Sequence, residues 1–292
     1  ALLYAFSFWT IFAAVRHPYF MNPMIYFPLV LAGADRIFRK KRPFLYIFSL
    51  AAAVMSNFYF GYMICLLVML YCIFRYKAVF GTFRLKQLAG WGGRFLGYSV
   101  IALLLSSVIL LPVALCALQS GRISTDHWIS LLYPLSYYKK FITAFLSGEA
   151  GYWSEMGYTA YGVLGVFLLF LQKKKNTLLK IGFCLMTAFM LLPFAGYALN
   201  GFAYVANRYA WAYGMVVAYI FVRTWPDLAE LTERQKKGMV LLGIGYGGIF
   251  LLAEEGRTEA RLSALVLLFV LILWLLTIGM EWMRQKKSTV FQ

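Results

Sequence analysis

Charged residues are scarce in this chain: only 13% of its 292 residues are Asp, Glu, Lys or Arg. A soluble domain of this length covers itself with charge, so the composition excludes an ordinary soluble protein. There are two histidines and four cysteines, and no pair of them has the spacing of a metal site. Because Cys65, Cys72, Cys116 and Cys184 all lie within apolar segments, we expect free thiols, no disulfide, and no metal or other cofactor.

Apolar residues dominate the chain instead. They make up 62% of the sequence, and the mean hydropathy is +0.72. Stretches close to the ~20 residues that a helix needs to cross a bilayer recur, most clearly at 95–118, 178–199 and 262–282. The sequence therefore predicts an all-α fold, a polytopic bundle of transmembrane helices.

The net charge of +17 would suit a nucleic-acid partner, but the placement of the charges does not. Of the 28 Lys and Arg residues, 21 fall in five clusters between apolar runs, at 36–42, 75–94, 173–180, 223–237 and 284–287. Basic loops of this kind stay on the cytoplasmic side of a membrane and attract anionic lipid headgroups. Since no nucleic-acid motif accompanies them, we expect a bilayer partner and no nucleic acid.

The stretch "SNFYFGY", at 56–62, separates apolar runs at 44–55 and 63–74. Basic clusters precede the first run and follow the second, so both lie on one side only if the chain turns back between them. Ser56 and Asn57 supply a polar break, and Gly61 supplies a flexible one. We therefore predict a hairpin with its tip at the outer face; a single kinked span is the alternative.

Alternation then gives about ten membrane segments in a single domain, 1–292, with both termini cytoplasmic. The segments are 2–15, 24–37, 44–55, 63–74, 95–118, 158–171, 178–199, 209–222, 239–253 and 262–282. A long extracytoplasmic loop is predicted at 119–157. The chain begins at Ala1 inside an apolar run, without Met, which favours a fragment of a longer protein.

Four polar groups fall on the predicted outer face, at 16–23, 57–62, 119–157 and 200–209. Ionisable residues at membrane depth are costly and often functional. The alternatives assign these residues no function: the aromatic residues could form an interfacial belt, and Asp126 with His127 could be a surface pair. Arg208 begins an apolar run, where it is either a headgroup anchor or a ligand for phosphate through bidentate bonds.

Five stretches carry a family resemblance. They read "HPYFMNPMIYFPLVLAGADRIFRKKRP", "SNFYFGY", "PLSYYKKFI", "YTAYGVLGVFLLFL" and "LNGFAYVANRYAW". In this order, from His17 to about Val222, they resemble successive motifs of the bacterial membrane protein YfhO family. The part from Trp225 onward contains only generic apolar segments.

The resemblance implies a function. Proteins of this family are similar to GT-C glycosyltransferases of the bacterial cytoplasmic membrane. These transfer a sugar from a polyprenyl-phosphate donor, on the extracytoplasmic side, to a cell-envelope polymer such as teichoic acid. The catalytic carboxylate of such folds lies in the first outer loop, so we expect it upstream of Ala1.

The chemistry assigns roles to the polar groups that are present. Arg208 is expected to stabilise the departing phosphate, and Glu155 and Asp126 are the fallback candidates for the base. The remaining substrate-binding candidates are Asn207, His17, Asn22, Asn57 and Tyr59. A transporter of lipid-linked saccharides and a non-catalytic membrane scaffold remain as alternatives.

Overall fold

The computed structural model describes residues 1–119, 129–146, 148–172, 175–228, 231–252 and 265–272. Within these ranges the chain is helical and contains no strand, only an isolated bridge between Glu149 and Glu155. The all-α prediction is confirmed. The longer helices are α2 (Phe8–Arg16), α3 (Asn22–Phe38), α4 (Phe44–Ser56), α5 (Phe58–Phe80), α6 (Leu85–Gln119), α7 (Leu135–Ala144), α8 (Thr159–Leu171), α9 (Thr177–Leu191), α11 (Ala210–Thr224) and α12 (Glu233–Leu252). Short helices occur at α1 (Leu2–Ala5), η1 (Pro18–Met21), α10 (Pro193–Leu199) and η2 (Trp225–Leu228).

The stretch 56–62 is a hairpin. Asn57 is extended, with φ −164° and ψ 106°, and its side-chain oxygen accepts the Phe60 N–H at 3.2 Å, which caps α5. A Cβ on Gly61 would lie 2.9 Å from the Val54 side chain. In one continuous helix these residues would be ~10 Å apart along the axis, so the chain must reverse between them. The predicted reversal of the chain is confirmed and the single kinked helix is wrong, while the location of the tip at the outer face stays a prediction.

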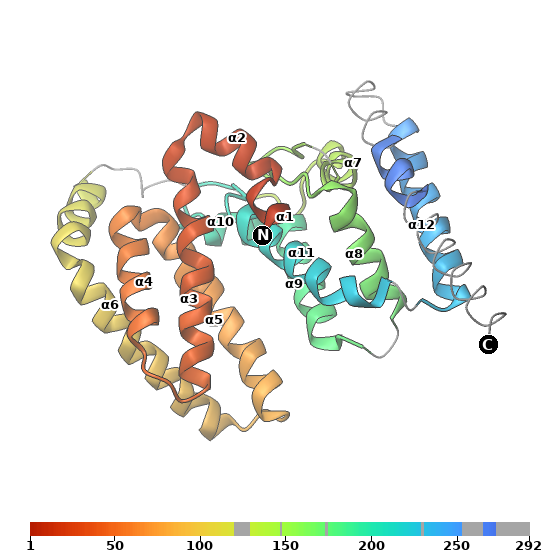
Figure 1. Ribbon diagram of the computed structural model, residues 1–292. Coiled ribbons are helices and arrows are strands. Elements are labelled where there is room, and N and C mark those ends of the chain that lie inside the picture. Colours follow the sequence, from red (N-terminus) through yellow and green to blue (C-terminus); the bar gives the residue numbers. More distant parts are fainter. Residues whose placement is uncertain (120–128, 147, 173–174, 229–230, 253–264, 273–292) are drawn as a thin grey trace.

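Helices α3 to α6 form one side of the molecule (Figure 1), and helices that follow one another in the chain run antiparallel. Close approach of α3 and α4 depends on Gly33, because a Cβ there would lie 2.5 Å from the backbone nitrogen of Tyr46. Asp35, near the end of α3, pairs with Arg39 at 2.6 Å and with Arg75 of α5. The basic residues that follow α3 and those at the end of α5 therefore lie at the same end of the bundle.

In the second half of the chain, α8, α9 and η2 pack against α11. Helices α8 and α11 pack closely at Gly165, where a Cβ would lie 3.1 Å from Phe221. Beyond their ends, Asp227 accepts a hydrogen bond from Gln172 at 2.9 Å and pairs with Lys175 at 2.5 Å. These polar contacts tie η2 to the turn between α8 and α9.

Two of the described helices, α5 and α6, are long and apolar enough to cross a membrane by themselves. The predicted segment 178–199 is not one straight helix, because α9 and α10 meet at 92° where Pro193 begins a new helix. The segment 2–15 is likewise divided into α1 and α2. Helices α4 and α8 have 13 residues each, shorter than a full span. The last predicted segment is described only at 265–272.

The predicted outer loop, 119–157, contains a helix that was not anticipated. Helix α7 buries Tyr137, Phe141 and Ala144 and leaves the Lys139 and Lys140 side chains exposed. Its apolar positions recur every three or four residues, as an amphipathic helix requires. Part of the predicted loop is thus a helix whose apolar face packs on the core of the bundle.

Candidate functional site

Four segments that are distant in the sequence meet at one end of the bundle, opposite the ion pairs of Asp35 and Asp227. They are η1, the start of α5, the turn at 148–158 and the connection at 200–209. Phe20 of η1 contacts Phe60 at 5.0 Å and Trp153 at 5.5 Å between ring centroids. The Tyr59 hydroxyl donates a hydrogen bond to the Asn200 carboxamide oxygen. The structure thus brings the four polar groups of the sequence together; we call this the Arg208 end.

The Arg208 guanidinium lies at the centre of this end, surrounded by aromatic rings. Its central carbon is 4.6 Å from the ring centroid of Trp153, 5.5 Å from Tyr204, 5.6 Å from Tyr59 and 5.7 Å from Phe20. We refer to these four rings as the aromatic box. Cation–π contacts stabilise a guanidinium by about 0.5–2 kcal/mol each. The rings come from four different segments, so only the tertiary fold assembles the box.

The positive charge of Arg208 has no counterion in the part of the chain that the structure describes. None of the acidic side chains there lies within ion-pair distance of it. Its Nε is buried and makes no hydrogen bond with a described residue. An uncompensated charge that is partly removed from water is costly, and an anionic ligand would offset that cost. The arrangement is therefore suited to binding an anion.

Tyr59 and Tyr204 are fixed beside Arg208 by Asn200. The Asn200 carboxamide oxygen accepts from Tyr59, and its nitrogen donates to the Tyr204 carbonyl at 2.7 Å. Asn200 is almost completely buried. It was not among the predicted site residues. Its signals in the sequence are its place directly after an apolar run and within the polar group at 200–209.

Asn207 is the centre of a buried hydrogen-bond network. Its side chain is 0% exposed and bonds with four hydroxyl groups. The carboxamide nitrogen donates to Ser154 at 2.9 Å and Tyr137 at 3.0 Å, and the oxygen accepts from Tyr133 and Tyr209 at 3.2 Å each. A Cβ on Gly196 would lie 2.6 Å from that oxygen, so only glycine leaves room for it. The donors and acceptors of the Asn207 side chain are all used within this network, so Asn207 holds the surrounding segments together and fixes the position of its neighbour Arg208.

The turn that carries Trp153 has an unusual backbone. Gly151, Tyr152 and Trp153 have φ values of +95°, +53° and +63° in succession. The left-handed region costs roughly 1–2 kcal/mol for a residue with a side chain. The turn is held by a 2.7 Å hydrogen bond from the Asn207 backbone N–H to the Tyr152 carbonyl. Such strain is concentrated at functional sites, and here it places the Trp153 ring over Arg208.

The other predicted binding residues lie at different distances from the aromatic box. The His17 ring is at its edge, 4.9 Å from Phe20 and 6.1 Å from Trp153 between centroids. Asn57 uses its carboxamide oxygen to cap α5. Asn22 begins α3, and its side chain makes no hydrogen bond with another residue in the described ranges.

Glu155, a fallback candidate for the base, is only 1% exposed. Burial, followed by the nearby Glu149, raises the pKa of its carboxyl group to about 8, and Arg16 opposes the shift. Oε2 of Glu155 has no hydrogen-bond partner among the described residues. In this conformation its carboxyl group does not reach a substrate in solvent. The other fallback candidate, Asp126, lies outside the described residues.

Comparison with known proteins gives a family match over the whole chain. The family model described as bacterial membrane protein YfhO matches residues 1–292. A curated relative, described as "Uncharacterized protein YfhO" from Bacillus subtilis (strain 168), is 23% identical over 228 residues. The match covers 74% of this chain and 24% of the relative, so the chain spans about a quarter of that protein's length. No solved structure matches.

Proposed function

The chain belongs to the YfhO family of bacterial membrane proteins, and on that basis we propose that it is part of a membrane glycosyltransferase of the GT-C type. The proposed donor is a sugar on a polyprenyl phosphate. The proposed acceptor is a cell-envelope polymer such as teichoic acid, on the extracytoplasmic side of the cytoplasmic membrane. Since the chain spans about a quarter of its relative, the proposal concerns the longer protein.

The observation that supports this proposal is the guanidinium in the aromatic box, which has no counterion among the described residues. A guanidinium offers two parallel N–H donors to a phosphate, a geometry that Lys cannot reproduce. Trp153 and Tyr204 present ring faces beside it. The apolar faces of a sugar ring pack well on such rings. One site would thus hold both parts of a sugar phosphate.

The reaction places clear demands on these groups. The bond between the anomeric carbon and the phosphate oxygen breaks, and its electron pair leaves with the polyprenyl phosphate. A bond forms between that carbon and the acceptor oxygen, whose proton passes to a base. The transition state has oxocarbenium character, while negative charge grows on the phosphate. In this proposal Arg208 would stabilise that growing charge, and the base is expected in the remainder of the protein.

Arg208→Lys in the full-length protein tests the proposal. Losing a charge-assisted bond of about 1.5–3 kcal/mol in the transition state should slow sugar transfer roughly 10- to 150-fold. The assay follows labelled sugar from a polyprenyl-phosphate donor into polymer. Arg94→Lys is the matched control, because Arg94 lies 5.1 Å over one ring, Trp91, outside the box. Equal transfer rates for parent and Arg208→Lys would make Arg208 a headgroup anchor and overturn the assignment.

A further inference from the structure

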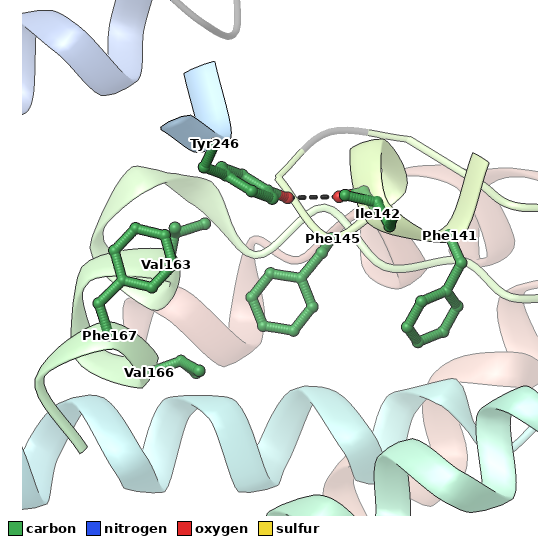
Figure 2. Close-up of a pocket in the computed structure, with 7 residues that line it drawn as sticks. All are labelled: Phe141, Ile142, Phe145, Val163, Val166, Phe167 and Tyr246. Atoms are coloured by element: carbon green, nitrogen blue, oxygen red, sulfur yellow. Dashed lines mark hydrogen bonds between the residues drawn. The ribbon is translucent and has the colours of Figure 1, made fainter. Parts of the chain in front are cut away.

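A second, wholly apolar site lies under α7, on residues that are not part of the aromatic box. A cavity of about 200 Å³ lies between α7, α8 and α12 (Figure 2). Its lining residues are Phe141, Ile142, Phe145, Val163, Val166, Phe167 and Tyr246. Ile142 is 43% exposed, so the cavity opens at the surface beside this residue.

The chemistry of the lining excludes a polar occupant. Among the described residues that line it, the Tyr246 hydroxyl is the only side-chain polar group, and it donates its hydrogen to the Ile142 carbonyl (Figure 2). A space of about 200 Å³ corresponds to roughly seven waters at about 30 Å³ each, and the lining side chains offer these waters no free donor. In a membrane protein, the abundant molecule that fits an apolar space open to the surface is a lipid chain.

The charge beside the opening indicates the kind of lipid. Lys139 is exposed, and it lies three residues before Ile142, which places both on the same side of α7. The helix therefore has a cation next to the mouth of the cavity, while Phe141 and Phe145 point into it (Figure 2). An amphipathic helix with a cation on one side and apolar rings on the other is typical of the boundary between headgroups and acyl chains.

We propose that this cavity binds one acyl chain of an anionic diacyl phospholipid, whose phosphate is paired with Lys139. The acyl chain would fill the space between α7 and α12. The hydrogen bond from Tyr246 to the Ile142 carbonyl also connects these two helices. This site is separate from the proposed sugar-transfer site, and each can fail without the other.

The experiment measures lipid retained by the full-length protein after purification in detergent. Phosphatidylglycerol, phosphatidylcholine and polyprenyl phosphate are added in turn, and bound lipid is counted by native mass spectrometry. We expect about one phosphatidylglycerol per protein. Lys139→Gln should lower its occupancy roughly fivefold, the change that ~1 kcal/mol per basic residue corresponds to, and leave phosphatidylcholine unchanged.

Val166→Trp fills the cavity and should abolish retention of either phospholipid, whereas two matched controls should not. Val108→Trp adds the same ring at a side chain of α6 that is 82% exposed. Lys86→Gln removes a charge from an exposed residue of α6. Equal phosphatidylglycerol occupancy in the parent and Lys139→Gln overturns the proposal. So does retention of polyprenyl phosphate in preference to phosphatidylglycerol, which would assign the cavity to a prenyl lipid.

Discussion

Removing the Asn207 carboxamide is expected to destabilise the whole Arg208 end. In Asn207→Ala the hydroxyls of Tyr133 and Tyr209 lose the oxygen to which they donate. Both residues are buried, so water does not readily replace that acceptor. Tyr137 and Ser154 remain 3.0 Å from each other and add little to the loss.

The magnitude follows from these two hydroxyls. A buried polar group left without a partner costs about 1–3 kcal/mol, so the variant should lose roughly 2–6 kcal/mol of unfolding free energy. At roughly 2–4 °C per kcal/mol for a large domain, the midpoint of thermal unfolding should fall by roughly 4–24 °C. The variant also deprives Arg208 of the neighbour that positions it, so anion binding should weaken.

Thermal unfolding of the purified protein in detergent micelles, followed by intrinsic fluorescence, measures this loss. Asn22→Ala is the matched control, because the Asn22 side chain makes no hydrogen bond with another described residue. We expect that control to unfold within about 2 °C of the parent, as surface substitutions within about 0.5 kcal/mol do. If Asn207→Ala unfolds at the same temperature as Asn22→Ala, the network does not stabilise the site and the reasoning is refuted.

Two further predictions concern pH and topology. Burial raises the folded-state pKa of Glu155 to about 8 from an ordinary value of 4.5, so the folded protein holds a proton that the unfolded chain releases. Stability should therefore be greatest below about pH 4.5 and fall as the pH rises to about 8. Glu155→Gln should flatten unfolding temperatures over this window; an unchanged slope would contradict the buried carboxyl. In a version lacking native cysteines, Ser56→Cys should react with an impermeant thiol reagent added outside the cell and Thr82→Cys should not. The reverse labelling would invert the predicted orientation.

The sequence by itself determined the class of the protein and its chain reversals. Long apolar runs leave only helices as a way to satisfy the backbone in a membrane, so the all-α fold followed from composition. The hairpin at 56–62 also has local causes, since Asn57 caps one helix and Gly61 admits close contact with the other. Local signals also placed the basic residues at the ends of helices.

Only the tertiary structure decided how the polar residues are used. The sequence grouped Asn207 with Arg208 as ligand contacts; in the fold Asn207 is fully buried in its own hydrogen-bond network, while the Arg208 Nε has no hydrogen-bond partner among the described residues. Hydropathy joined 178–199 into one segment, whereas packing and Pro193 bend it by 92°. The partner of Tyr59 is Asn200, 141 residues away, and the ring nearest Arg208 is on a left-handed turn. The spacing of apolar residues shows which segments are helices and which face of each is buried. A site depends on which distant side chains become neighbours, and the packing of the whole chain decides that.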